Sequence, residues 1–211
     1  MSAFRNANGK SIVLAMIKAI QNNREYLGQI DGLIGDGDHG MNMNKGFTMC
    51  EKSIKDKNLS FSECLGQLGD ILLTEIGGSM GPIYGTIFMD MAGRAQDEID
   101  GKIFSGMLNA GRDGLFEIID ARVGDKTLVD VLAPACDAFG NAVDSGDDFV
   151  QALGKMKETA EAGKESTKEL VAKFGRSSRL GERSKGVLDA GATSCNIILQ
   201  AMADEILNIL N

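Results

Sequence analysis

The chain has 211 residues, of which 43% are hydrophobic and 25% are charged. This composition is typical of a soluble globular protein, and the length predicts a single domain over residues 1–211. The 30 acidic and 22 basic side chains give a formal net charge of −8, which disfavours nucleic acid and membrane surfaces as partners because both carry negative charge. The 27 glycines and only 2 prolines indicate helices separated by glycine-containing loops.

The first hydrophobic stretch, Ile12 to Ile20, is interrupted by Lys18 and is followed by no small-residue cleavage site. It is too short to span a membrane and lacks the features of a signal peptide. The four cysteines are far apart and show no C-x-x-C spacing. We therefore expect reduced thiols, mostly in the core of a cytoplasmic protein.

Apolar residues recur at spacings of three and four along most of the chain, which is the periodicity of amphipathic helices. The predicted helices span residues 9–30, 41–54, 61–76, 83–96, 104–121, 127–143, 147–174 and 192–210. No segment alternates apolar and polar residues long enough to indicate a strand. These patterns predict an all-α fold, and because the connections are short we expect a bundle of about eight antiparallel helices.

The first connection between helices holds three aspartates within eight residues: Asp31, Asp36 and Asp38. Like charges crowded in this way need a cation or bound protons to be tolerated. Oxygen ligands without cysteine, and with a single histidine in the chain, favour Mg²⁺ or Ca²⁺ over zinc. The alternative is that the three aspartates only cap helix ends.

Two familiar motifs are excluded for this loop. An EF-hand starting at Asp36 requires Gly and Glu at the positions of Met41 and Phe47. The glycines of residues 35–40 satisfy G-x-G-x-x-G, but no strand precedes them and two aspartates inside the pattern would repel a pyrophosphate. We favour carboxylates that hold Mg²⁺, with a phosphate bound to the ion and to backbone N–H groups at the next helix start.

Two more glycine-containing loops each precede a predicted helix, at residues 77–82 and 124–127. In the first, glycines allow backbone amides to approach a ligand, and Ser79 can cap the helix or bond a phosphate. A tight turn between helices explains the same residues without a ligand. The second loop is also explained by a helix cap at Asp125 or Thr127.

The last connection, residues 174–186, is rich in glycine, serine and basic side chains within an acidic chain. A solvated loop is one explanation for such a charge run. The other is a mobile arm that closes over a polyphosphate, with an arginine fork on its oxygens.

Together these segments resemble one family. The chain is similar to the ADP-binding L subunit (DhaL) of phosphotransferase-system-dependent dihydroxyacetone kinase in the segments IGDGDHGMNMNKGF, GGSMGPIYG, GDKTLVDVLAPA and GRSSRLGERSKGVLDAGATS. Their order and spacing match from about Ile12 to the C-terminus. The resemblance implies a barrel of eight antiparallel helices with the nucleotide site at one rim.

The resemblance also implies site residues. Asp31, Asp36 and Asp38 would bind two Mg²⁺ ions. ADP or ATP would be bound by His39, Gly40, Met41, Asn42, Ser79, Met80 and Arg176 at the phosphates, and by Leu128, Asp189, Ala190 and Gly191 at the base and ribose. For His39 we favour a hydrogen bond to phosphate, with a helix-cap role as the alternative. The chain departs from the family at Met80, Leu128 and Ala190, where Ser, Met and Pro are usual.

The implied reaction needs two partners. A phosphohistidine on the M subunit would phosphorylate ADP that stays bound as a coenzyme, and the phosphoryl group would pass to dihydroxyacetone on the K subunit. The resemblance also allows a transcription regulator as a partner. Phosphoryl transfer requires mainly positioning and charge neutralisation, which carboxylate-bound Mg²⁺ would supply.

Two other functions stay open at this point. One is a nucleotide domain that exchanges ATP freely, in a kinase for another hydroxyketone or an acyl substrate. The other is a non-catalytic Mg-nucleotide sensor that binds a regulator. Retention of ADP through gel filtration argues against free exchange. Failure of phosphoryl transfer with any K and M subunits, despite tight ADP binding, would favour the sensor.

Overall fold

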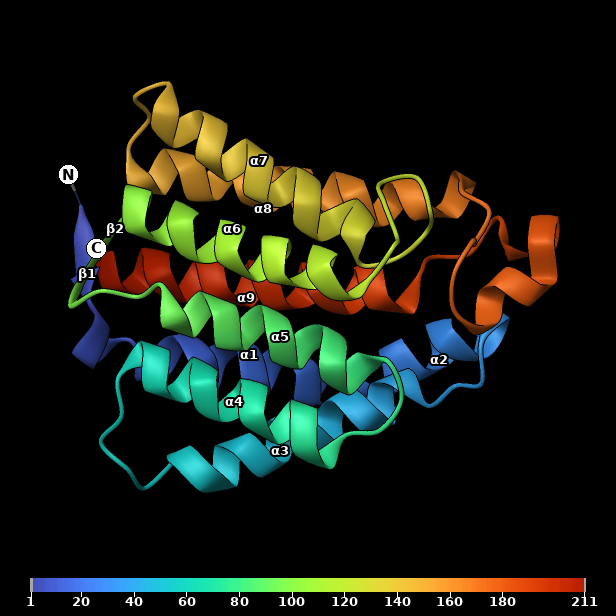
Figure 1. The fold of residues 1–211 in the computed structure, drawn as a ribbon, viewed down its shortest axis with the longest axis horizontal. Helices are drawn as coiled ribbons and strands as arrows, with labels where there is room; N and C mark the ends of the chain where they lie inside the picture. The colour runs from blue at the N-terminus through green and yellow to red at the C-terminus, as the bar shows by residue number, and fades with distance from the viewer. Residues whose placement is uncertain (1, 211) are drawn as a thin grey trace.

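Nine α-helices make up most of residues 2–210, the part of the chain that the computed structural model describes (Figure 1). They are α1 (Lys10–Asn22), α2 (Arg24–Ile34), α3 (His39–Ile54), α4 (Phe61–Glu75), α5 (Met80–Gly93), α6 (Gly101–Ile118), α7 (Val129–Asp144), α8 (Phe149–Ser166) and α9 (Ala190–Leu210). Three 3-10 helices are η1 (Asn6–Asn8), η2 (Thr167–Glu169) and η3 (Arg176–Ser184). The predicted all-α fold is confirmed.

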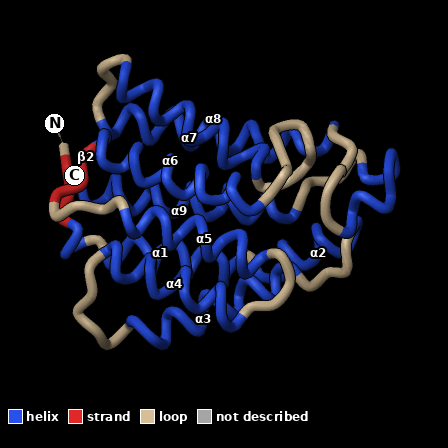
Figure 2. The backbone as a smooth tube through the Cα atoms, viewed as in Figure 1, coloured by secondary structure: helices blue, strands red, loops and turns tan. Residues whose placement is uncertain are grey.

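Eight of these helices close into a barrel. Helix α1 packs against α3, and the ring continues through α4, α5, α6, α7, α8 and α9 back to α1. Neighbours in the ring run antiparallel, as Figures 1 and 2 show. The remaining helix, α2, lies at one end of the barrel and packs against α3, α9 and η3.

The barrel interior is a hydrophobic core to which each helix contributes one stripe of side chains. In α1 the stripe contains Ile12, Met16 and Ile20, which are spaced by four residues and are all inaccessible to solvent. Burial of each such side chain stabilises the fold by about 1.5–3 kcal/mol. The four cysteines are free thiols and all are buried, as predicted.

Two predicted helices prove too long. The helix predicted over residues 9–30 breaks at Asn23, whose side-chain amide donates to the carbonyl of Ala19 at 2.8 Å. The helix predicted over 147–174 ends at Ser166, where the hydroxyls of Ser166 and Thr167 bond the carbonyls of Gly163 and Lys164. In both places a polar side chain competes for a carbonyl that the helix would otherwise use.

The expectation that the chain has no strand is also corrected. Strand β1 (Ala3–Arg5) pairs antiparallel with β2 (Glu98–Asp100), with Phe4 opposite Ile99. Three residues are too few to show the period-two alternation by which strands are predicted. The ribbon at the end of the barrel that carries the termini is stabilised by its two buried side chains, Phe4 and Ile99.

The opposite end of the barrel carries the loops that the sequence analysis singles out. The α2–α3, α4–α5 and α6–α7 connections and the segment before α9 all lie there (Figure 1). Because neighbours alternate in direction, α3, α5, α7 and α9 all begin at this end. Within residues 2–210, no helix is both long and apolar enough to cross a membrane.

Candidate functional site

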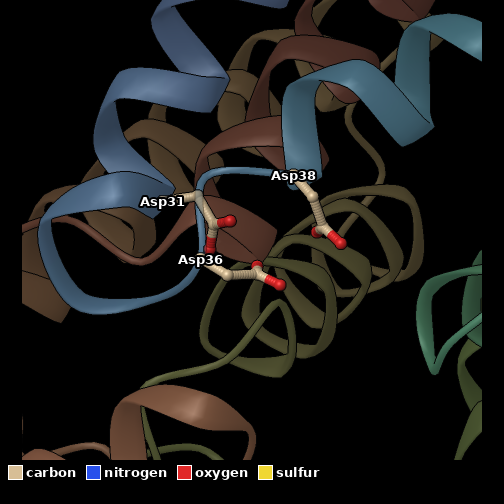
Figure 3. Close-up of side chains that lie close together, drawn as sticks. All are labelled: Asp31, Asp36 and Asp38. Carbon is tan, nitrogen blue, oxygen red and sulfur yellow. The ribbon is translucent and has the colours of Figure 1, made fainter.

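The three aspartates of the first connection come together. Asp31 lies on α2, and Asp36 and Asp38 lie in the loop that leads to α3 (Figure 3). One carboxylate oxygen from each lies within 4.8 Å of the other two. Gly35 allows this approach, because a Cβ at that position would overlap the Asp31 carboxylate. A set of carboxylate oxygens at this spacing suits a divalent cation such as Mg²⁺ or Ca²⁺.

The electrostatics of this group, which we call the acidic cluster, also favour a cation. Partial burial raises the pKa of the Asp38 carboxyl, and the charges of Asp36 and Asp31 raise it further. Arg176 opposes this effect. A bound divalent ion would remove the repulsion that makes ionisation of Asp38 costly.

Helix capping accounts for only part of the acidic cluster. The Asp31 carboxylate accepts the backbone N–H of His39 at 3.3 Å, at the start of α3. Asp38 occupies the N-cap position of α3, but its side chain makes no capping hydrogen bond. Asp36 forms an ion pair with Arg176. Capping therefore does not explain why Asp36 and Asp38 are present.

Arg176 lies in η3, far along the sequence from the aspartates, and its guanidinium pairs with the Asp36 carboxylate. The connection between α8 and α9 thus reaches across the end of the barrel to the acidic cluster. Because the Arg176 side chain is 64% exposed, this pair contributes little to stability. Because the ion pair is exposed and weak, the Arg176 guanidinium can bind another anion in place of the Asp36 carboxylate.

A buried polar network connects the acidic cluster to the start of α9. His39 Nε2 lies 2.9 Å from the hydroxyl of Ser194, and that hydroxyl lies 2.6 Å from the hydroxyl of Tyr84. Both hydroxyls also reach the carbonyl of Gly191, at 3.1 and 3.2 Å. Burial lowers the pKa of the His39 imidazole and thereby favours its neutral form.

The residues predicted to line the base and ribose also meet. Asp189 Oδ2 accepts the N–H of Ala192 at 2.7 Å, and this bond caps α9. A Cβ on Gly191 would lie 3.6 Å from the backbone nitrogen of Leu128, at the start of α7. Burial raises the pKa of Asp189 to about 6. The structure thus places Leu128 beside the turn formed by Asp189, Ala190 and Gly191.

The other predicted residues lie at the same end of the barrel, and one of them contacts the acidic cluster, because the N–H of Asn42 donates to the carbonyl of Asp38 at 3.0 Å. Met41 and Asn42 lie in the first turn of α3, and Ser79 and Met80 lie at the start of α5. Ser79 is exposed, and its side chain makes no capping hydrogen bond. Gly40 is buried, and a Cβ there would overlap the carbonyl of Arg24, so this glycine allows α2 and α3 to pack closely.

Of the two caps expected in the 124–127 loop, Thr127 bonds the start of α7 and Asp125 does not. The Asp125 carboxylate accepts the N–H of Arg122 and pairs with Lys173 at 2.6 Å, so Asp125 does not cap α7. The Thr127 hydroxyl accepts the N–H of Val129 at 3.2 Å. The buried carboxylate of Asp130 closes the loop by accepting two further backbone N–H groups.

Sequence reasoning missed three polar residues of this region: Tyr84, Ser194 and Lys126. Tyr84 and Ser194 lie inside helices, where a polar residue gives no signal of its partner. Lys126 is part of the GDKT segment, and its left-handed backbone conformation has no signature in the sequence.

Comparison with known proteins identifies the family. A model of the DAK2 domain matches residues 33–204. The chain is 38% identical to the ADP-binding subunit DhaL of the PEP-dependent dihydroxyacetone kinase of Escherichia coli, over 85% of this chain and 87% of that protein. It is 35% identical to DhaL of dihydroxyacetone kinase 1 of Listeria innocua, over 87% of this chain and 88% of the other.

Longer kinases match over a part of their length. The chain is 29% identical to the D-erythrulose kinase of Mycolicibacterium smegmatis, over 90% of this chain but 34% of that enzyme. The crystal structure of the dihydroxyacetone kinase of C. freundii superimposes with a TM-score of 0.73 at 22% identity, over 96% of this chain and 35% of that chain. This structural likeness shows that the fold is shared.

The DAK2 match covers most of the chain, and the DhaL subunits match along nearly all of their own length. The chain therefore belongs to the DAK2 domain family, as a relative of the DhaL subunits of dihydroxyacetone kinases.

Proposed function

We propose that this chain is the ADP-binding subunit of a dihydroxyacetone kinase and that it forms a single nucleotide-binding domain. The observation that carries the proposal is the acidic cluster, at the barrel end where four helices begin. Helix N-termini offer unpaired N–H groups and positive potential to phosphates. Carboxylates at the same place repel phosphates unless a divalent cation lies between them.

The proposed ligands follow from this arrangement. Asp31, Asp36 and Asp38 hold two Mg²⁺ ions, which neutralise phosphate charge when bound. His39, Gly40, Met41 and Asn42 at the start of α3, Ser79 and Met80 at the start of α5, and Arg176 contact the phosphates. Leu128, Asp189, Ala190 and Gly191 contact the base and ribose. In support, the similar subunits are named ADP-binding, and a C. freundii dihydroxyacetone kinase is described in complex with AMP-PNP and Mg²⁺.

In the proposed reaction this chain positions a nucleotide between two partners. A phosphohistidine carrier subunit, M, donates a phosphoryl group to the retained ADP, and dihydroxyacetone on the K subunit receives it. The relatives named as separate subunits favour this scheme over the erythrulose kinases, which match over about a third of their length. We expect the protein to act in the cytoplasm, where such carriers work.

Native mass spectrometry tests the proposal directly. Protein purified in the presence of Mg²⁺ should carry one ADP and two Mg²⁺ ions, and the ADP should persist through gel filtration. With phosphoenolpyruvate, the carrier proteins and a K subunit, the loaded protein should phosphorylate dihydroxyacetone. Protein that binds no ADP even when Mg²⁺ and ADP are added would refute the proposal.

The acidic cluster can be tested by replacing one carboxylate at a time. We expect Asp36→Asn and Asp38→Asn each to abolish Mg²⁺-dependent retention of ADP, because each removes a charged metal ligand. The helical circular dichroism should stay unchanged, since neither side chain caps α3. Asp144→Asn, at an exposed aspartate of α7 at the other end of the barrel, is the control and should retain ADP.

A further inference from the structure

The connection between α8 and α9 forms a loop whose two ends are held together. We call residues 168–187 the arm. The N–H of Gly186 donates to the carbonyl of Lys168 at 2.7 Å. Just outside it, the N–H of Asp189 donates to the hydroxyl of Thr167 at 3.0 Å. The arm therefore leaves and rejoins the barrel at one point, its neck.

One side chain from a different loop crosses this neck. Lys126 Nζ donates to the carbonyl of Thr167 on one side and to the carbonyl of Val187, at 2.5 Å, on the other. The whole Lys126 residue is 1% exposed. A single ammonium group thus bonds the residue just before the arm and the last residue of the arm, in addition to the backbone hydrogen bond between Lys168 and Gly186.

The backbone at Lys126 is specialised for this contact. Lys126 has φ of 61°, and among residues 2–210 it is the only residue other than glycine with a positive φ. This conformation costs an L-residue about 1 kcal/mol. The strain is maintained by the surrounding loop, in which the buried Asp130 carboxylate accepts the N–H groups of Gly124 and Thr127 at 2.6 and 2.7 Å.

The charge at this position is also costly. Burial lowers the pKa of Lys126, while Asp189, Asp130 and Glu169 raise it. A buried apolar side chain would avoid the desolvation cost of an ammonium group. The Lys126 ammonium suits this place because it carries three N–H donors, which allow one group to bond two converging carbonyls.

The neck lies between two parts of the proposed nucleotide site. Arg176 is carried on the arm and reaches the acidic cluster through Asp36. Asp189 follows the neck immediately and caps α9. A second contact also holds the arm to the loop that carries Lys126, because Lys173 of the arm pairs with Asp125 of that loop.

We propose that Lys126 is a positioning residue: it closes the neck of the arm and thereby sets where Arg176 and Asp189 lie in the site. It acts without touching the acidic cluster. The part of this inference that concerns nucleotide rests on the proposed function. The part that concerns the arm does not.

Hydrogen exchange on the nucleotide-free protein tests the neck. In Lys126→Met, the N–H groups of Gly186 and Asp189 should exchange about tenfold faster or more, because the neck opens locally. Amides in the middle of α4 and α5 should keep their rates. Lys126→Gly is the second variant: it fits the positive φ and removes the backbone strain, so it secures a folded protein. Both variants should behave alike. Unchanged exchange in either folded variant would overturn the proposal.

Nucleotide affinity then tests positioning. Calorimetry with Mg-ADP should give a weaker affinity for Lys126→Gly and for Arg176→Ala, and the double variant should lose less than the product of the two fold-changes. Lys126→Arg, which keeps a cation at the neck, should recover part of the affinity. Independent, multiplicative losses would overturn the positioning role. A wild-type protein that binds no Mg-ADP would refute the proposed function. The hydrogen-exchange result would then still show whether Lys126 closes the neck.

Discussion

Tyr84 and Ser194 connect the acidic cluster to the start of α9 through buried hydroxyl groups. Tyr84→Phe keeps the ring and removes the hydroxyl that lies 2.6 Å from Ser194 Oγ. We expect the free energy of unfolding to fall by about 1 kcal/mol, which lowers the melting temperature by roughly 2–4 °C in a chain of this size. Tyr26→Phe is the matched control, because Tyr26 is 43% exposed. An equal loss in both variants would contradict the network.

Asp189 should make the stability of the nucleotide-free protein depend on pH. Burial raises the pKa of Asp189 from its ordinary 3.8 to about 6. Between these pH values the folded state binds more protons than the unfolded state, so the free energy of unfolding falls as the pH rises through this window. Above it, the loss is complete and on the order of 3 kcal/mol.

Asp189→Asn should remove this component, because the amide oxygen still accepts the N–H of Ala192 and cannot ionise. Urea unfolding at pH 4.5 and 7.5 measures how the free energy of unfolding depends on pH. The difference between the two pH values should be smaller in Asp189→Asn than in the wild type. Asp56→Asn, at an exposed aspartate, should match the wild type. Equal pH dependence of the free energy of unfolding in all three proteins would rule out a raised pKa for Asp189.

At the scale of single residues, the sequence predicts those site residues that are neighbours in the chain. Asp31, Asp36 and Asp38 lie within eight positions, so their crowding is visible before any fold is known. The partner of His39 is 155 positions away. Such a contact depends on α3 and α9 meeting across the barrel end, and no local pattern encodes it.

At the scale of the helix, the sequence predicts that a helix is present more accurately than it predicts where the helix begins and ends. Apolar periodicity identifies every barrel helix, because each buries one stripe in the core. The periodicity does not reveal the break at Asn23. Apolar residues continue on both sides of Asn23, so the pattern predicts one helix in place of α1 and α2. Their separation matters, since it turns α2 across the barrel end and brings Asp31 to the loop.

The start of α8 shows a helix boundary with a local cause. Asp148 and Gln151 form a capping box: each side chain bonds the backbone N–H of the other residue, at 2.8 and 3.0 Å. Asp148→Ala should lower the free energy of unfolding by about 1 kcal/mol. Because this cap lies at the barrel end opposite the acidic cluster, retention of ADP should be unaffected.

Urea unfolding and gel filtration of the loaded protein measure these two quantities. Asp144→Ala, which removes an exposed carboxylate at the end of α7, controls for the change of charge and should leave both unchanged. Loss of ADP from Asp148→Ala would show that the two barrel ends are coupled.

For the whole molecule, the short connections predict antiparallel neighbours but not the closure of the ring. The contacts of α1 with α9 and with α3 join segments that are not consecutive in the chain. The alternation of direction places four helix N-termini at one end, and the closure of the ring brings them together around the proposed nucleotide site. The insertion of α2 outside the ring then adds the acidic cluster to that end.

The same end of the barrel carries exposed apolar side chains that suit a partner subunit. Leu33 at the end of α2 is 67% exposed, and Val123 in the α6–α7 loop is 59% exposed. In the proposed reaction, phosphoryl transfer to a sugar on the K subunit requires that subunit to cover this end, since reacting atoms must approach to about 3–3.5 Å. A charge placed in such an interface would be desolvated without a partner.

We therefore expect Leu33→Glu and Val123→Glu each to reduce phosphoryl transfer to dihydroxyacetone by about tenfold or more, which corresponds to about 1.4 kcal/mol of lost interaction. Retention of ADP should be unchanged, because neither side chain belongs to the proposed nucleotide site. Val150→Glu is the control: Val150 is also exposed, but it lies in the first turn of α8 at the other end of the barrel. An equal loss in Val150→Glu would place the partner elsewhere, and full activity in both rim variants would exclude this end as the docking surface.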